Sequence, residues 1–107
     1  MVRSMKAYEM HAEFCKIFSH PLRLALLDVF REGGKTVTQL QKQLHTSQST
    51  ISQHLAMLRR LGMVKTRKEG RLVYYSIADE RILKAYDLVD QIVRERRAAE
   101  AKILQYR

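Results

Sequence analysis

The sequence predicts a mainly α-helical fold that carries one two-stranded β-hairpin. Apolar residues recur three and four positions apart over most of the chain, which is the periodicity of amphipathic helices. β-branched and aromatic residues are concentrated in two short runs, Met63–Arg67 and Leu72–Ile77, as expected for strands. The chain has 107 residues, of which 46% are hydrophobic, so we expect one domain with its own core over 1–107.

Two helices are expected in the first third of the chain. The first, from Ser4 to Phe18, has one apolar face. Pro21 suits the first position of the second helix, because its missing N–H costs nothing there. The second helix is apolar nearly all round up to Glu32, which predicts a central position in the fold. Gly33-Gly34 ends it, because glycine tolerates the left-handed conformation of a helix cap.

The third helix is short and begins with a capping motif. Thr36 and Gln39 have the spacing of a capping box, in which each side chain bonds to the other residue's backbone N–H. The apolar residues that this helix is expected to bury are Val37, Leu40 and Leu44.

The rest of the chain predicts a longer helix, a hairpin and a last helix. Ser47 is a good N-cap for the helix Gln48–Leu61, and Lys68–Arg71 is typical of a hairpin tip between the two strands. Asp79 can cap a last helix that reaches about Gln105. A short helix, a tight turn and a longer capped helix form a motif that reads DNA, and a hairpin directly after it makes the winged variant. The sequence therefore predicts a winged helix-turn-helix domain with an additional helix at each end.

The chain is strongly basic, which favours a polyanionic partner. Lys and Arg total 20 against 11 Asp and Glu, a net charge of +9, so nucleic acid is the first candidate and an anionic membrane surface the second. No apolar run approaches the roughly 20 residues of a membrane-spanning helix, and the N-terminus lacks the apolar segment of a secretory signal. One cysteine cannot form an internal disulfide or a zinc finger built on cysteine pairs. We therefore expect a cytoplasmic protein without a membrane partner.

The helix 48–61 is expected to be the DNA-reading element. At about 100° per residue, Ile51, Leu55 and Leu58 share the core side, and a polar side with almost no charge in its first two turns lies opposite. Such a side fits the major groove, while the helix N-terminus favours a phosphate. The residues expected to contact bases or phosphates are Thr46, Ser47, Gln48, Ser49, Thr50, Ser52, Gln53 and Arg60. The alternative is an ordinary solvated face.

Basic residues surround the predicted hairpin. Six cations and one acid lie between positions 59 and 71. Lys68 and Arg71 at the tip suit contacts with backbone phosphates or the minor groove. The alternative is that these cations discourage aggregation through an edge strand. His54 lies toward the core edge of the preceding helix, and we expect it to be packed and hydrogen-bonded rather than in contact with DNA.

Three segments resemble the ArsR/SmtB family of winged-helix repressors. They are Ser47–Val64, with the motifs SQSTISQHL and LRRLGMV, Ser19–Leu24, and Arg67–Ile77, with RKEGR and YYSI. The resemblance covers roughly Phe14–Val93. It implies a dimeric transcriptional repressor that occludes a promoter. It also implies base contacts from Gln48, Ser49, Ser52 and Gln53.

The chain departs from this family at its metal sites. Thr36 and Thr38 stand where the family has cysteines near the start of the third helix, and the last helix has no histidine. Neither usual zinc site can therefore be assembled, and we expect no metal and no cofactor. His11 and Cys15 share a helical face and form one candidate metal or thiol sensor, the alternative being a buried Cys15 and a surface His11. No catalytic constellation stands out, so we expect no enzyme.

Apolar stripes on the first and last helices predict a homodimer. The residues expected at its interface are Tyr8, Ala12, Phe18, Ile82, Val89 and Ile92. A two-fold dimer would place two recognition helices about 34 Å apart, one turn of operator DNA. The sequence does not identify an inducer. Two other functions stay open, a winged helix that binds a protein partner and a non-specific nucleic-acid binder, although the latter should carry more lysine and arginine on its recognition helix.

Overall fold

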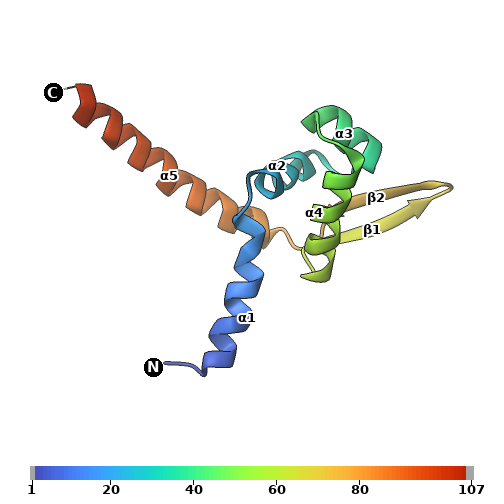
Figure 1. Cartoon of the computed structure of the whole chain (residues 1–107), viewed down its shortest axis with the longest axis horizontal. Helices are drawn as coiled ribbons and strands as arrows, with labels where there is room; N and C mark the ends of the chain where they lie inside the picture. Colours follow the sequence, from blue (N-terminus) through green and yellow to red (C-terminus); the bar gives the residue numbers. More distant parts are fainter. Residues whose placement is uncertain (1, 106–107) are drawn as a thin grey trace.

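The computed structural model describes residues 2–105 and has the expected order of elements. They are α1 (Met5–Cys15), η1 (Lys16–Phe18), α2 (Pro21–Val29), η2 (Phe30–Glu32), α3 (Val37–Leu44), α4 (Gln48–Arg60), β1 (Val64–Glu69), β2 (Leu72–Ile77) and α5 (Arg81–Gln105). The first two expected helices each end in a 3-10 turn. Figure 1 shows α2, α3 and α4 grouped beside the hairpin, while α1 and α5 leave this group in different directions and the hairpin projects away from α5.

Side chains cap the helices where the sequence indicated. The Thr36 hydroxyl accepts a hydrogen bond from the backbone N–H of Gln39 at 3.2 Å, and the Gln39 side chain accepts one from the N–H of Thr36 at 2.9 Å, which confirms the capping box. Ser47 caps α4 by accepting from the N–H of Thr50. Between these helices His45 adopts a left-handed conformation, with φ 51°, and this turns the chain from α3 into α4.

The core lies between α2, α3, α4 and the start of the hairpin, so the central position of α2 is confirmed. Its fully buried side chains include Ile17, Leu26, Leu27, Leu40, Ile51, Leu58 and Met63. Val37 and Leu44, which were expected to be buried, are half-buried at its edge. Ile82 was expected on an exposed apolar stripe, and this is wrong. It is only 6% exposed and belongs to the core, because the first turn of α5 packs against the domain before the helix leaves it.

The hairpin is longer and its turn tighter than expected. β1 and β2 are antiparallel, and their register runs from Val64 opposite Ile77 to Glu69 opposite Leu72. The turn therefore contains only Gly70 and Arg71, and Gly70 has a φ of 60° that favours glycine. Lys68 lies in β1 rather than in the turn, a correction to the expected tip of four residues.

Two backbone hydrogen bonds attach the hairpin to the rest of the domain. The N–H of Lys35 donates to the carbonyl of Tyr75 at 2.9 Å, and the N–H of Tyr75 donates to the carbonyl of Lys35 at 2.8 Å. They join β2 to the loop before α3. Because paired backbone groups hold a fixed geometry, they set the position of the hairpin relative to the helices.

Polar groups tie the beginning of α5 to α2. The Tyr86 hydroxyl donates to the carboxylate of Asp28 at 2.8 Å, and Arg31 pairs with both Asp28 and Asp87. Burial and the Asp28 carboxylate raise the pKa of Tyr86 to about 12. Further along, every residue from Gln91 to Ile103 is exposed. The helix is thus fixed to the domain at its start and extends freely beyond it (Figure 1).

Candidate nucleic-acid interface

The packing of α4 presents the expected polar face to solvent. Ile51, Leu55 and Leu58 are at most 1% exposed and hold the helix against the core. The exposed residues on the remaining surface include Gln48, Ser49, Ser52, Gln53, Ala56 and Arg60. No carboxylate lies on this helix. The orientation deduced from the helical period is therefore confirmed, and α4 offers a surface of short and amide side chains with basic residues at its C-terminal end.

Three of the expected contact residues already have partners within the domain. Ser47 donates its hydroxyl hydrogen to Thr50 at 2.9 Å and also accepts from the Thr50 backbone, so both side chains belong to the cap. The Thr46 hydroxyl donates to the carbonyl of Leu44 at 3.0 Å. These hydroxyls define the start of α4. Ser49 and Gln53, in contrast, have no side-chain hydrogen bond to any residue in the described part of the chain.

Some basic residues of the hairpin are paired within the domain, and others are not. Arg67 pairs with Glu69, and its guanidinium lies 5.1 Å from the centre of the Tyr74 ring. Lys68 and Arg71 are exposed, and neither forms an ion pair within residues 2–105. Positive charge is therefore available to a partner at and beside the turn, as the sequence indicated, and also at the exposed Lys65 near the start of β1.

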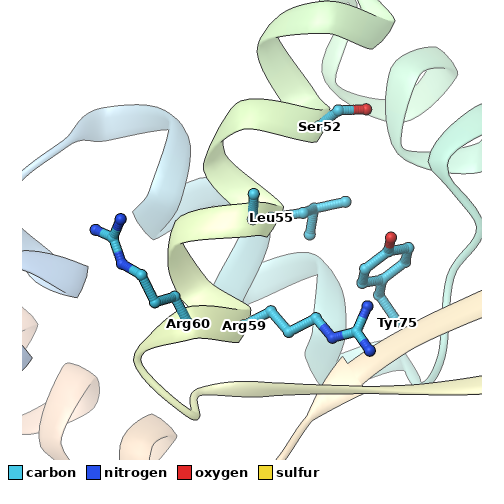
Figure 2. Close-up of a pocket in the computed structure, with 6 residues that line it drawn as sticks. Ser52, Leu55, Arg59, Arg60 and Tyr75 are labelled. Atoms are coloured by element: carbon cyan, nitrogen blue, oxygen red, sulfur yellow. The ribbon is translucent and has the colours of Figure 1, made fainter.

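A cleft of about 360 Å³ separates the second half of α4 from β2. It is lined by Ser52, Leu55, Ala56, Arg59, Arg60 and Tyr75, and we call it the α4–β2 cleft. Figure 2 shows Ser52, Leu55 and Arg59 pointing to the side of α4 on which Tyr75 lies, whereas the Arg60 side chain leaves on the other side. Arg59 and Tyr75 were absent from the residues expected to bind DNA. Arg59 follows Ser52 by two helical turns and lies on the same side of α4, so the helical period could have indicated Arg59. Nothing in the sequence around Tyr75 indicates that this residue lies opposite α4.

His54 is packed against His20 and lies near the buried Arg23. It is half-buried, and its ring centre lies 4.4 Å from that of His20, which caps α2 through its Nδ1. The nearby Arg23 is 8% exposed, donates to Met57 Sδ and Ser19 Oγ, and has no carboxylate partner within the described residues. Burial first, and then the nearby His20 and Arg23, lower the pKa of His54. The expected packing of His54 is confirmed, but it has no hydrogen-bond partner within residues 2–105.

Apart from Ile82, which lies in the core, the residues expected at a dimer interface fall into two groups. Tyr8, Val89 and Ile92 are 42%, 52% and 53% exposed, and Ala12 is also exposed. Phe18 is half-buried and lines an apolar groove of about 240 Å³ with residues of α2 and α5. Leu88 and Val93, absent from the expected set, are exposed on α5 as well. An apolar surface thus remains on α5 without Ile82.

The metal and thiol candidates lie on α1. His11 and Cys15 are exposed on α1, so the alternative of a buried Cys15 is wrong. Thr36 is the N-cap of α3 and Thr38 is exposed beside it. Within residues 2–105, no three His, Cys, Asp or Glu side chains are grouped closely enough to hold a metal ion. None of the helices in this part of the chain combines the length and apolar character needed to span a membrane.

Comparison with known proteins agrees with this architecture. Residues 20–66 match the family model described as "Bacterial regulatory protein, arsR family". An uncharacterized HTH-type transcriptional regulator of Methanocaldococcus jannaschii is 40% identical over 89 residues, which are 82% of this chain and 100% of the relative. The biofilm growth-associated repressor of Xylella fastidiosa is 36% identical over 81 residues, 76% of this chain and 68% of the relative.

A solved structure extends the comparison to the fold. The homodimeric winged helix-turn-helix DNA-binding domain of Mb0332 from Mycobacterium bovis has a TM-score of 0.76 and 26% identity, covering 89% of this chain and 91% of that one. It shares the helix-turn-helix and the wing described above. The chain therefore belongs to the arsR family of bacterial regulatory proteins, and it is a winged helix-turn-helix transcriptional regulator.

Proposed function

We propose that the protein binds a specific operator as a homodimer and represses transcription by occluding the promoter. The residues proposed to contact DNA are Thr46, Ser47, Gln48, Ser49, Thr50, Ser52, Gln53, Arg60, Lys68 and Arg71. Acting on DNA implies work in the cytoplasm. We propose no catalytic role and no metal or other cofactor.

The polar face of α4 carries this proposal. Three buried leucine and isoleucine residues hold the helix rigidly, while the serine and glutamine side chains opposite them are exposed. Base edges in the major groove are read by such donors and acceptors, and glutamine can bond adenine at two positions. A protein that bound nucleic acid without sequence preference would gain more from lysine and arginine at these positions. The face therefore favours sequence-specific reading.

Phosphate contacts supply affinity around this reading face. The N-terminus of α4 offers backbone N–H groups and the positive end of the helix dipole near Thr46 and Ser47. Lys68 and Arg71 are exposed at the end of the hairpin, where they can reach the backbone or the minor groove. With α4 in the major groove, these two regions would lie on either side of the bases that Gln53 reads.

The apolar surface of α5 supports a homodimer. Leu88, Val89, Ile92 and Val93 are 45% to 65% exposed. In a two-fold dimer both copies would bury these residues, because each copy contributes the same surface to the interface. It would also place two α4 helices about one DNA turn apart. The homodimeric state of the Mycobacterium bovis domain supports the same arrangement.

The repressor role rests on the size of the complex. A dimer over two half-sites one turn apart covers a segment of DNA that RNA polymerase would otherwise occupy. The Xylella fastidiosa relative is named a repressor, which supports this direction of control.

The test compares one base-reading and one phosphate-binding variant on DNA selected from the region upstream of the protein's own gene. Gln53→Ala should weaken binding by about 1–3 kcal/mol and relax the preference at one base pair of each half-site. Arg71→Ala should weaken binding to all sequences alike and reduce the slope of log K against log salt by about one for each copy.

Binding to random duplex DNA at two salt concentrations separates the other functions. If random DNA and the selected operator bind equally and lose affinity equally with salt, the protein is a non-specific binder. If neither binds, a protein partner becomes the better explanation. If Gln53→Ala changes neither affinity nor preference, the proposed placement of α4 in the groove is wrong.

A further inference from the structure

The α4–β2 cleft brings together three hydrogen-bond donors from two separate parts of the chain. Ser52 and Arg59 come from α4, and Tyr75 comes from β2. Figure 2 shows the Arg59 guanidinium extending toward the Tyr75 ring, with the Ser52 hydroxyl on the same side of the helix. The backbone pair between Tyr75 and Lys35 fixes the base of this tyrosine.

The hydrogen-bond donors in the cleft are free to bind a ligand. Within residues 2–105, the side chains of Ser52, Arg59 and Tyr75 have no hydrogen-bond or ion-pair partner. No carboxylate lines the cleft, and its apolar lining residues are Leu55 and Ala56. A guanidinium and two hydroxyls are chemically suited to a tetrahedral anion, to which arginine donates more than one hydrogen bond.

The position of the cleft indicates which anion this is. On duplex DNA the sugar-phosphate backbone forms the ridge between the major and the minor groove. If α4 lies in the major groove and the hairpin reaches the neighbouring minor groove, one backbone strand passes between them. The α4–β2 cleft is the space between those two elements (Figure 2).

We propose that the α4–β2 cleft holds one phosphodiester of the operator backbone, bound by the Arg59 guanidinium and the Tyr75 and Ser52 hydroxyls. This inference rests on the proposed function. It adds Arg59 and Tyr75 to the interface and assigns Ser52 to a phosphate rather than to a base. A phosphate bound in the cleft would set the angle between α4 and the duplex. This angle in turn determines which bases Gln53 can reach.

Arg60 is the natural comparison for Arg59. The two arginines are neighbours on α4 and both are exposed, but Figure 2 shows their side chains leaving on different sides of the helix. Arg60 also lines a groove with Glu9 and Glu13 of α1. The pKa of Glu13 is lowered mainly by Lys16 and additionally by Arg60, which agrees with this direction. Loss of either arginine removes one charge from the DNA-binding surface. Both residues line the cleft, but only the Arg59 side chain extends to the side on which Tyr75 lies.

The experiment combines these variants with single neutral phosphates in the operator. Each phosphate of one half-site is replaced in turn by a methylphosphonate, and the dissociation constant is measured for the full-length wild type, Arg59→Gln, Tyr75→Phe and Arg60→Gln. Tyr75→Phe removes only the hydroxyl, so the ring continues to pack, and circular dichroism melting verifies that each variant is folded. A variant that loses the contact should no longer respond to the matching neutral phosphate, as in a double-mutant cycle.

We expect one phosphate position at which the wild type loses about tenfold in affinity, equivalent to about 1.4 kcal/mol. At that position Arg59→Gln and Tyr75→Phe should lose less than about twofold, a coupling large enough to identify contacting groups. Arg60→Gln should weaken binding to the unmodified operator yet keep the full response to the same methylphosphonate. This pattern would establish the cleft as the binding site of one operator phosphate.

Other results would overturn the proposal in distinguishable ways. If the wild type binds no operator at all, the proposed function itself fails. If it binds but the effects of Arg59→Gln and of every methylphosphonate add without coupling, only the cleft assignment fails. If that coupling is absent, yet inorganic phosphate shifts the Tyr75 ring resonances of the DNA-free protein at submillimolar concentration and Arg59→Gln removes the shift, the cleft is a site for a free anion instead.

Discussion

Ile82 and Ile92 are the same residue type on the same helix, yet the structure gives them different surroundings. Ile82 is 6% exposed and packs in the core, whereas Ile92 is 53% exposed. Alanine at each position removes the same atoms. The comparison therefore separates the part of α5 that stabilises the protomer from the part proposed to join two protomers.

The expected magnitudes follow from these exposures. For Ile82→Ala, three carbon groups at about 0.8 kcal/mol each give about 2.4 kcal/mol of lost transfer energy. The cavity that remains raises the cost to about 2–5 kcal/mol. For Ile92→Ala, only about half of that transfer energy is available to a partner, which gives about 1.3 kcal/mol per copy and about 2.5 kcal/mol per dimer. The dimer dissociation constant should then rise about 60-fold.

Two measurements separate the effects. Urea unfolding at several protein concentrations gives the free energy of unfolding and its dependence on dimerisation. Sedimentation equilibrium gives the dissociation constant. Ile82→Ala should lower stability at every concentration, whereas the effect of Ile92→Ala should appear only where the wild type is dimeric.

Three outcomes would contradict these expectations. A dissociation constant that stays within twofold of wild type in Ile92→Ala would place the dimer interface elsewhere. An Ile82→Ala variant destabilised by less than about 1 kcal/mol would contradict the core packing, because buried isoleucine truncations cost more than this. A wild type that sediments as a monomer at micromolar concentration would refute the proposed homodimer itself.

Three further outcomes are expected. The pKa of His54 is lowered from about 6.5 in the folded chain, so the unfolded chain binds a proton more readily and the free energy of unfolding should fall as the pH drops below about 6.5. In urea titrations from pH 7.5 to 5, the free energy of unfolding of His54→Gln should fall less steeply with pH than that of the wild type. If the two proteins show the same pH dependence, His54 is not its source. Thr36→Ala should cost about 1 kcal/mol by removing the α3 cap, and Thr36→Ser should restore most of it; equal melting of the two variants would argue against the cap. Operator binding should be unaffected by a chelator or by added zinc, cadmium, copper or nickel, and a tenfold loss with one metal that persists in Cys15→Ser would contradict this expectation. If Cys15→Ser abolished such a loss, the His11–Cys15 pair would become the explanation.

Local sequence determined the helices, their caps and the face that α4 presents. The Thr36–Gln39 box and the Ser47 cap form between residues three positions apart, so a few neighbouring side chains are enough to define them. The alternation of Ile51, Leu55 and Leu58 with polar residues likewise fixes which side of α4 is buried, because one helical period contains that information. The fold class and the polar reading face followed from these signals.

Only the tertiary structure determines which elements lie opposite a given face of α4 or α5. The helical period places Ile82 and Val89 on one stripe, but it does not tell where α5 leaves the domain, and that point makes the first a core residue and the second an exposed one. Arg59 and Tyr75 meet across the α4–β2 cleft because the hairpin is bonded to the loop before α3, a contact between distant segments. Such contacts depend on the packing of whole elements, whereas propensity and periodicity describe one element at a time.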